Sequence, residues 1–352
     1  MARALRLAER GLNTTTPNPR VGCVLVRDGR VVGEGWHEKA GQPHAEAHAL
    51  RAAGDRARGA VAYVSLEPCS HHGRTPPCCD ALIEAGVARV VAAMEDPNPR
   101  VAGEGLARLR SAGISVACGL MEQAARELNI GFVSRMSRGR PWLRLKAAAS
   151  LDGKTALENG VSQWITGPDA RRDAHAWRAR SCAVLTGIGT VRDDDPRLTV
   201  RDVPCERQPL RVIVDSRLET PRNARILEGG NVLIVAAVGD AERARALREA
   251  GAEIVLLPNP AGKVDLAALM QALGRRGVNE LLAEAGFKLN GSLLREGLVD
   301  ELLLYLAPSL IGDAARGLFD LPGLTDLSGQ RRLDLQDVRR VGSDLRILAR
   351  PV

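Results

Sequence analysis

Aromatic residues are scarce in this chain, and their scarcity limits what its positive charge can mean. They make up 3% of 352 residues, against a formal net charge of +7. Proteins that bind single-stranded nucleic acid combine a basic groove with aromatic side chains on which the bases stack. The basic residues here are 44 arginines and five lysines, spread along the whole chain among acidic residues. We therefore expect a solvated arginine-rich surface that suits small phosphorylated ligands, and no nucleic-acid partner.

The chain also lacks any apolar run that approaches the length of a membrane-spanning helix. Residues 1–10 follow the charged pattern of an amphipathic helix and contain no signal-peptide core. The seven cysteines are unevenly spaced, which argues against a disulfide framework and suits a reducing compartment. We therefore expect a cytoplasmic protein without disulfides or a membrane partner, and 352 residues are enough for two domains with separate cores.

A stretch from Pro43 to Cys79 contains the residue types of a metal site. His44, Cys69 and Cys78 offer one imidazole and two thiolates, which give Zn²⁺ three of its four tetrahedral ligands and leave one position for water. Glu46 follows His44 by two residues and is placed to hold a proton beside that water. This is the arrangement of the zinc deaminases, so we predict His44, Cys69 and Cys78 as zinc ligands and Glu46 as the catalytic proton carrier.

Two other interpretations of the same residues stay open. In a closed structural zinc site, His71 or His72 supplies the fourth ligand, since a Cys-x-x-His spacing occurs in such sites. That interpretation leaves Glu46 without a role. Cys79 is the other candidate ligand, but its spacing to the apolar residues three and four positions later predicts that it packs in the core.

The pattern of apolar runs in the first part of the chain predicts an α/β sheet. A buried strand over residues 21–26 is followed by a hairpin turn at 27–30 and a returning strand over 31–35. Further strands over 61–66 and 87–94 alternate with helices that begin near His44 and Cys78. Open α/β sheets place their ligands at strand ends and helix starts, which is where the metal-site residues fall.

Four segments taken together resemble the RibD family, the bifunctional deaminase-reductases of riboflavin biosynthesis. They are residues 16–23, 44–46, 68–78 and 95–99. The insert of residues 70–77 between the two cysteines departs from the Cys-x-x-Cys of general nucleoside deaminases. The resemblance implies a cytidine-deaminase-like three-layer α/β/α domain in residues 1–139 and a dihydrofolate-reductase-like α/β domain in residues 140–352.

The resemblance also implies two activities and two cofactors. A zinc-dependent hydrolytic deamination of diaminohydroxyphosphoribosylaminopyrimidine would come first. NADPH-dependent reduction of the ribosyl side chain of 5-amino-6-(5-phosphoribosylamino)uracil to ribityl would follow. Arg74 and Thr75 lie between the two thiolates, where a guanidinium and a hydroxyl suit the substrate phosphate. Asn18, in a turn-like segment, is a candidate to bind the pyrimidine edge.

The second part of the chain predicts another α/β domain after a polar linker at residues 134–140. Its expected strands are residues 144–149, 183–186, 210–215, 232–237, 254–257, 280–283 and 301–306. Gly187 and Gly189 follow a strand, but Arg192 stands where a dinucleotide fingerprint needs glycine. We expect residues 290–292 to open a helix whose backbone amides suit a pyrophosphate.

Resemblance alone implies the ligand contacts of this second domain. The expected NADPH contacts are Ala148, Trp164, Thr190, Asp194, Ser216, Gly286, Phe287, Lys288, Leu289, Asn290, Gly291 and Ser292. The expected substrate contacts are Ser162, Arg178, Leu198, Arg201 and Glu284. Lys146, Asp194 and the substrate itself remain alternatives for the proton transfer, and Arg217 is a candidate for selecting NADPH over NADH. The family also implies a homodimer or higher homo-oligomer.

Two rival functions remain at this point. A zinc nucleoside or tRNA deaminase fused to an unrelated binding domain would share the metal residues but accept substrates without the sugar phosphate. A structural zinc module for protein interaction would bind the metal in a closed site and release no ammonia.

Overall fold

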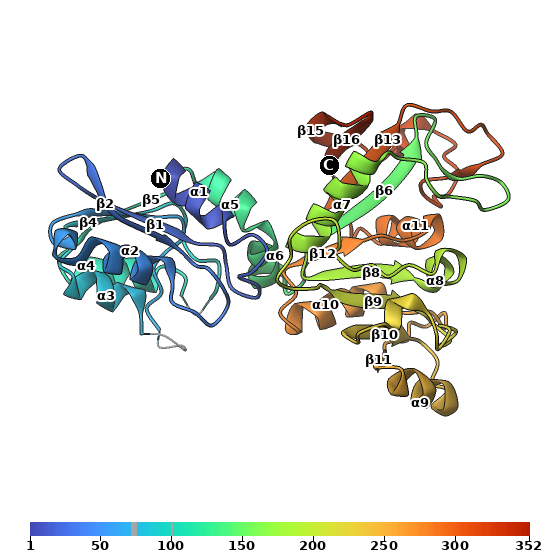
Figure 1. Cartoon of the computed structure of the whole chain (residues 1–352), viewed down its shortest axis with the longest axis horizontal. Coiled ribbons are helices and arrows are strands. Elements are labelled where there is room, and N and C mark those ends of the chain that lie inside the picture. Colours follow the sequence, from blue (N-terminus) through green and yellow to red (C-terminus); the bar gives the residue numbers. More distant parts are fainter. Residues whose placement is uncertain (72–75, 100) are drawn as a thin grey trace. The chain divides into compact units, whose positions relative to one another are not determined.

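The computed structural model describes residues 1–71, 76–99 and 101–352. The chain divides into two compact units, Met1–Gly139 and Arg140–Val352, which we call unit 1 and unit 2 (Figure 1). Among the helices of the described residues, none combines the length and the apolar character that crossing a membrane requires.

Unit 1 is built on a five-stranded sheet in the order β2-β1-β3-β4-β5. β1 pairs antiparallel with β2 and β3, whereas β3, β4 and β5 are parallel. The β1–β2 hairpin turns through Asp28 and Gly29, both with positive φ, as the sequence predicted. The strands are β1 (Gly22–Arg27), β2 (Arg30–Trp36), β3 (Val61–Val64), β4 (Arg89–Ala92) and β5 (Ser115–Cys118).

Helices cover both faces of this sheet, which gives the predicted three layers (Figure 1). One face carries α2 (Ala45–Ala53), α3 (Cys78–Glu84) and α4 (Glu104–Ser111), and the other carries α1 (Ala2–Glu9) and α5 (Glu122–Leu128). α2 lies directly on β2 because Gly35 has no side chain. A Cβ at Gly35 would lie 2.4 Å from the Cβ of His48 and 2.7 Å from the carbonyl oxygen of Ala45.

The predicted linker at residues 134–140 is wrong for most of its length. Residues 134–138 belong to α6 (Ile130–Arg138), which ends at Gly139 in the left-handed conformation. The stretch is polar because it is the last turn of an amphipathic helix: Ser137 and Arg138 are exposed, whereas Phe132 and Ser134 are buried. The Arg138 guanidinium also donates to the Ser134 hydroxyl one turn earlier.

Unit 2 is built on a nine-stranded sheet in the order β11-β10-β9-β8-β12-β6-β13-β16-β15. Neighbouring strands from β11 to β13 are parallel, and β16 and β15 add an antiparallel edge. Each of the seven predicted strands is present. The strands are β6 (Trp142–Ser150), β8 (Ala183–Gly187), β9 (Leu210–Val214), β10 (Val232–Ala236), β11 (Ala252–Leu256), β12 (Glu280–Ala283), β13 (Glu301–Ala307), β15 (Leu333–Val341) and β16 (Asp344–Pro351), while β7 (Lys154–Ala156) pairs with β14 (Arg316–Gly317).

Alternate residues of the central strands feed two separate cores, one on each face of this sheet. In β8, Ala183 and Leu185 pack with α10 (Leu266–Arg275) and α11 (Phe287–Arg295). Val184 points the other way and packs with α7 (Pro168–Arg180), α8 (Ile188–Asp194) and α9 (Ala241–Glu249). This alternation is the reason that the parallel strands are apolar on both faces.

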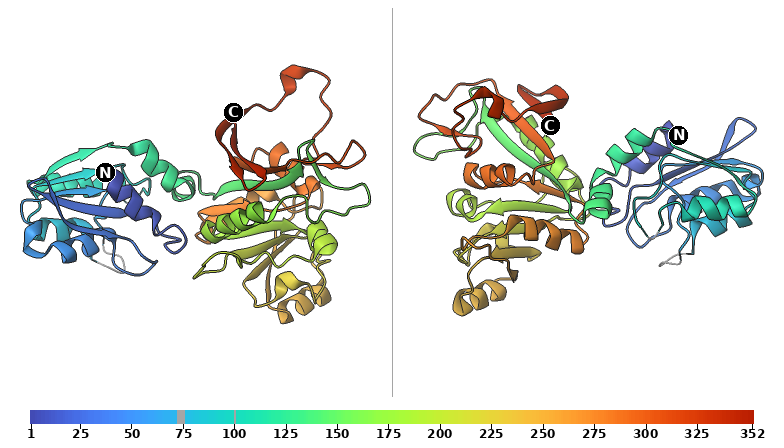
Figure 2. Two further views of the ribbon diagram at one scale, coloured as in Figure 1. Left: turned by 45° about the horizontal axis from the view of Figure 1, so that its top comes forward. Right: turned by 180° about the vertical axis from the view of Figure 1, so that it is seen from behind.

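The strand order reverses between β8 and β12, and this places two helix starts next to each other. β8 leads directly into α8, and β12 leads through residues 284–286 into α11. In open parallel sheets such a reversal opens the crevice in which ligands bind. The chain between β13 and β15 loops away from the sheet of its own unit before β15 forms the edge (Figure 2).

Candidate active sites

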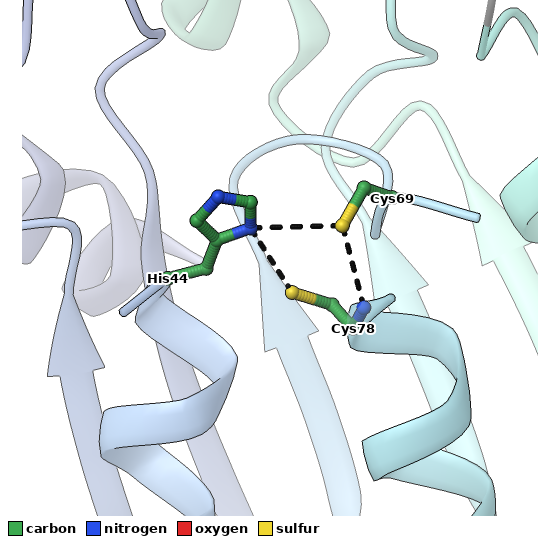
Figure 3. A group of neighbouring side chains, drawn as sticks. All are labelled: His44, Cys69 and Cys78. Atoms are coloured by element: carbon green, nitrogen blue, oxygen red, sulfur yellow. Dashed lines mark hydrogen bonds between the residues drawn. The ribbon is translucent and has the colours of Figure 1, made fainter. Parts of the chain in front are cut away.

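His44, Cys69 and Cys78 converge in unit 1, although they come from three different segments (Figure 3). The Nδ1 atom of His44 lies 3.2 Å from Sγ of Cys78 and 3.6 Å from Sγ of Cys69. The backbone N–H of Cys78 donates to Sγ of Cys69 at 3.3 Å. All three ligand atoms lie within 4.8 Å of one another, so a single metal ion can contact each of them.

Helix ends and a strand end position these three residues. His44 is the N-cap of α2 and Cys78 is the first residue of α3, as the sequence predicted. Cys69 follows β3, whose backbone leads into residues 65–68. The first backbone N–H of α3, that of Cys78, donates to the Cys69 sulfur, and this contact favours the thiolate form of Cys69, the form that binds metals.

The Cys69 and Cys78 thiol groups shift each other's pKa in opposite directions. The hydrogen bond with Cys78 lowers the pKa of Cys69 to about 4, against the opposing effect of burial. The same hydrogen bond, together with burial, raises the pKa of Cys78. Metal binding needs both sulfur atoms as thiolates, so it is coupled to the loss of their protons.

The donor set fits zinc. Bond lengths of about 2.0 Å to nitrogen and about 2.3 Å to sulfur, at the tetrahedral angle, separate the two ligand atoms by about 3.5 Å. The observed separations of 3.2 and 3.6 Å agree with this spacing. Three protein ligands are the number that catalytic zinc sites use, because the fourth position is kept for water or substrate.

Glu46 lies beside this cluster and is 3% exposed. Burial, followed by the charge of the Cys69 thiolate, raises the pKa of Glu46 to about 7. The Cys78 thiol and His44 act in the opposite direction. A carboxyl group in this environment exchanges a proton near neutral pH, which suits a general acid and base.

The closed structural site receives no support from His71, which is exposed and outside the cluster that the described residues form. His72, Arg74 and Thr75 lie outside the described residues, so their predicted roles stay predictions. Cys79 is completely buried in the core of unit 1, as its spacing predicted.

His37 belongs to this site, and sequence reasoning missed it. Its Nδ1–H donates to the carbonyl oxygen of Pro43 at 3.1 Å, which leaves Nε2 to accept from the Asn18 amide at 3.1 Å. Its ring also meets the ring of His44 edge-on, with the centroids 5.3 Å apart. His37 is 2% exposed and fixes which way round the Asn18 amide lies. Its only signal in the sequence is a polar residue just after a strand.

Unit 2 contains a buried charged cluster at the carboxyl end of β12. Two guanidinium N–H groups of Arg178 donate to the two oxygens of Glu284, one of them at 2.9 Å, and Nζ of Lys146 lies 3.7 Å from Oε2 of Glu284. Burial alone would raise the pKa of Glu284, but Arg178 and Lys146 outweigh it and lower that pKa to about 2. Burial lowers the pKa of Lys146. Lys146 therefore lies close to the expected substrate contacts Arg178 and Glu284.

The loop that carries Arg201 is held on α7 by His175 and Arg178. The backbone N–H of Arg201 donates to Nδ1 of His175 at 3.2 Å, and Nε2 of His175 lies 3.2 Å from Asp202. Arg178 donates to the carbonyl oxygen of Thr199 at 3.2 Å. His175 was not among the predicted site residues, and nothing in the local sequence distinguishes it.

Two pairs of expected contact residues lie close together in unit 2. The Ser162 hydroxyl donates to Asp194 at 3.1 Å, and a Cβ on Gly286 would lie 3.6 Å from the Thr190 hydroxyl. Gly286 is the N-cap of α11 and is exposed, so the first amides of this helix are accessible to an anion. Trp164 is 70% exposed, and the Arg171 guanidinium lies over its ring at 4.7 Å from the centroid. An exposed indole suits a planar ligand.

Other expected contacts are buried or structural in this unit. The predicted helix start at residues 290–292 is wrong, because α11 begins at Phe287 and the whole triplet lies inside it. Asn290 is 2% exposed and donates to Ala285, and Gly291 packs against the backbone of Asp320. Leu198 is 5% exposed, so its side chain belongs to the core. Ala148 is half-buried in β6, and Ser216 follows β9.

Comparisons with known proteins agree with both units. Residues 141–347 match the family described as the RibD C-terminal domain, and residues 1–94 match the cytidine and deoxycytidylate deaminase zinc-binding region. The riboflavin biosynthesis protein RibD of Escherichia coli K12 is 52% identical, over 98% of this chain and 96% of the relative. The RibD of Aquifex aeolicus is 42% identical over 98% of this chain and 96% of its own length.

Solved structures give the same result. A structure of Acinetobacter baumannii RibD superposes with a TM-score of 0.91 at 45% identity and covers 100% of this chain and 97% of that chain. A Thermotoga maritima structure, described as a diaminohydroxyphosphoribosylaminopyrimidine deaminase/5-amino-6-(5-phosphoribosylamino)uracil reductase, superposes with a TM-score of 0.87 at 33% identity, with the same coverage of 100% and 97%.

The fold and the site define a zinc-dependent deaminase joined to an NADPH-dependent reductase in a single chain. The predicted fold class and the two cofactors are therefore confirmed. The chain belongs to the RibD family, and it is a bifunctional deaminase and reductase of riboflavin biosynthesis. A zinc deaminase fused to an unrelated binding domain is excluded, because the second unit matches the reductase of the same family.

Proposed function

We propose that the chain first deaminates diaminohydroxyphosphoribosylaminopyrimidine and then reduces the ribosyl group of 5-amino-6-(5-phosphoribosylamino)uracil to ribityl. The observation that carries the first step is the convergence of His44, Cys69 and Cys78 beside the buried carboxyl group of Glu46. The substrates are those in the description of the Thermotoga maritima relative, which this chain covers almost completely.

The test is one assay with two readouts. Ammonia release and NADPH oxidation are measured on the phosphorylated pyrimidine and, in parallel, on cytidine. We expect both signals with the phosphorylated pyrimidine and neither with cytidine. Ammonia release from cytidine at a similar rate would contradict the proposed substrate.

In the first step, His44, Cys69 and Cys78 would hold zinc. Zinc, when bound, lowers the pKa of water so that hydroxide is available near neutral pH. Glu46, which is buried beside the three ligands, would take a proton from the attacking water and deliver it to the departing amine. Asn18, held by His37, binds the edge of the pyrimidine ring.

Arg74 and Thr75 bind the substrate phosphate in this proposal. Their position between Cys69 and Cys78 supports it, together with the affinity of a guanidinium for phosphate. An Arg74→Ala variant should raise the KM of the deaminase about 10-fold or more and leave the reductase KM unchanged. An unchanged deaminase KM would exclude the contact.

In the second step, Arg178, Arg201, Glu284, Ser162 and the backbone at Leu198 bind the substrate, and Lys146 lies among them. NADPH, when bound, supplies the hydride. Trp164 covers a planar ring of the cofactor, and the exposed start of α11 at residues 286–288 binds a cofactor phosphate. The remaining contacts of the cofactor site are Ala148, Thr190, Asp194, Ser216 and residues 289–292. The proton transfer belongs to Lys146, Asp194 or the substrate, and replacement of Lys146 by Met separates these alternatives through the pH profile of NADPH oxidation.

We further propose that the chain self-associates and is cytoplasmic. β15 is an edge strand, and its Leu333, Leu335 and Val338 are 41%, 60% and 52% exposed. They pair with alternate residues of β16 and therefore lie on one face. A Leu335→Glu variant that kept the oligomer of the parent chain in sedimentation would contradict the proposal that this face of β15 forms the interface.

The proposed cytoplasmic location rests on the cysteines. Those of the described residues are all free, which suits a reducing compartment.

A further inference from the structure

Glu67 is a buried carboxylate of unit 1 that the proposed mechanism does not use. It is 3% exposed and lies two residues before Cys69. Oε2 accepts the backbone N–H groups of Asp96 and Gly103 at 3.0 Å each. Oε1 accepts those of Gly105 at 2.9 Å and Leu106 at 3.2 Å. Four backbone donors thus converge on one side chain.

These donors come from the start of α4 and the loop before it. The first N–H groups of a helix have no partner inside the helix, and the positive end of its dipole favours a negative charge. A buried carboxylate is costly unless hydrogen bonds satisfy both of its oxygens. Glu67 accepts the free N–H groups at the start of α4, and those N–H groups in turn provide hydrogen bonds for both oxygens of the buried carboxylate.

The same contact fixes the segment that delivers Cys69. Gly105 lies directly against Pro68, since a Cβ at Gly105 would come within 2.0 Å of the Pro68 carbonyl oxygen. That oxygen also accepts from the Cys79 thiol at 3.2 Å. On the other side of Cys69, Arg108 of α4 donates to the carbonyl oxygen of Ser70 at 3.2 Å. α4 therefore holds the chain both before and after Cys69.

α3 is tied to the same segment. The backbone N–H of Cys79 donates to the carbonyl oxygen of Cys69 at 3.2 Å, next to the bond from Cys78 N–H to the Cys69 sulfur at 3.3 Å. The separation of the Cys69 and Cys78 sulfur atoms thus depends on how residues 67–69 lie between α3 and α4.

We propose that Glu67 is a positioning residue of the zinc site. Its carboxylate fastens residues 67–69 to the start of α4 and so sets where the Cys69 sulfur lies relative to His44 and Cys78. The inference rests on the proposed zinc-dependent deamination. A helix cap that only stabilised α4 would leave the geometry of the bound metal unchanged when it is weakened.

The experiment uses the full chain with cobalt in place of zinc, because cobalt–thiolate absorption reports ligand geometry. A Glu67→Gln substitution puts an NH₂ group where one oxygen accepts two N–H donors. We expect the cobalt–thiolate bands to shift, zinc release to a chelator to accelerate about 10- to 100-fold, and the deaminase kcat to fall by a similar factor. NADPH oxidation by unit 2 of the same chain should be unchanged.

Two matched variants separate positioning from charge and from stability. Glu104→Gln removes an exposed acidic group from the first turn of the same helix, and it should keep the parent spectrum. Leu109→Ala removes a completely buried side chain of α4 and lowers stability, but it leaves the partners of Glu67 in place. It should also keep the parent spectrum in its folded fraction.

Glu67→Asp keeps the negative charge on a shorter side chain. It replaces Glu67→Gln in the same measurements if Glu67→Gln does not fold. We expect it to lie between the parent and Glu67→Gln in spectrum and in the rate of zinc release. An unshifted spectrum with unchanged zinc release, or failure of both variants to fold, would overturn the positioning role. If the parent chain itself bound no metal or released no ammonia, the proposed function would fail instead.

Discussion

Glu46 and Glu284 are both buried carboxyl groups, and their surroundings drive them in opposite directions. Glu46 has a thiolate nearby, so burial and Cys69 raise its pKa to about 7. Glu284 is also buried, but Arg178 and Lys146 lower its pKa to about 2. The first group can therefore exchange a proton near neutral pH, whereas the second is a permanent charge that organises two cations.

Replacement of Glu46 by Gln should abolish proton transfer without removing a metal ligand. We expect the deaminase kcat to fall about 10²- to 10⁴-fold, because this is the usual contribution of a general acid and base. The zinc content and the reductase rate should match those of the parent chain. Ammonia release, elemental analysis and NADPH oxidation measure the three quantities, and an active Glu46→Gln deaminase would contradict the assigned role.

The charge of Glu284 should make the stability of unit 2 depend on pH. Its pKa is lower in the folded chain than the ordinary value of 4.5. Its contribution is therefore complete above pH 4.5 and is lost as the pH falls toward 2. We expect the free energy of unfolding of the parent chain to exceed that of Glu284→Gln by about 3 kcal/mol at pH 7. Near pH 2 the two free energies should be nearly equal.

Urea unfolding followed by tryptophan fluorescence measures this difference, since Trp142, Trp164 and Trp177 lie in unit 2. Glu253→Gln is the control, because Glu253 pairs with Arg276 at the surface and should contribute less than about 1 kcal/mol. A difference between the parent and Glu284→Gln that did not change with pH would show that the ion pair is not its source.

Helix α7 acts as a support for the loop that carries Arg201. His175 and Arg178 lie one turn apart on α7, and each holds a backbone group of residues 199–201. Burial, followed by the charge of Arg178, lowers the pKa of His175 to about 4. His175 therefore stays neutral near pH 7, and its Nδ1 can accept the N–H of Arg201.

Removal of that acceptor should loosen substrate binding in the reductase. A His175→Phe variant keeps a ring at this position but leaves the Arg201 N–H without its partner, which costs about 1–3 kcal/mol. We expect the reductase KM for the uracil substrate to rise about 10-fold, with a smaller change in kcat. Steady-state NADPH oxidation measures both, and Arg172→Ala, an exposed position on α7, is the control. A fall in kcat alone would contradict a role in binding.

The molecule consists of two units, each with its own core and its own set of reacting groups. The residues around the metal site all belong to unit 1, and the cluster around Glu284 belongs to unit 2. The hydrophobic clusters likewise stay within one unit. Loss of the metal should therefore affect only one of the two reactions.

Incubation of the full chain with a zinc chelator tests this independence. We expect ammonia release to disappear and NADPH oxidation with the uracil substrate to keep at least about 80% of its rate, because no ligand of the metal lies in unit 2. Added zinc should restore the deaminase. A parallel loss of both activities would mean that the metal also supports unit 2.

Much of the fold followed from local patterns, and the failures also have local causes. The seven parallel strands of the large sheet in unit 2 were predicted because such strands are continuous apolar runs. β15 was missed because its exposed residues mix apolar and charged side chains without a buried face. Residues 134–138 were taken for a linker because Met136 is the only large apolar residue in that window, and the large side chain that α6 buries, Phe132, lies before it.

The sequence by itself determined the metal chemistry and the family. The motif of His44, Glu46, Cys69 and Cys78 supplies the imidazole, carboxyl and thiolate groups of a zinc deaminase, and it can be recognised without the fold. Only the tertiary structure decided the environment of these groups. The four donors around Glu67 lie 29 to 39 residues away in sequence, Arg178 lies 106 residues from Glu284, and His37 lies 19 residues from Asn18. Such partners come together through the packing of helices on sheets, and packing depends on the whole core rather than on any local pattern.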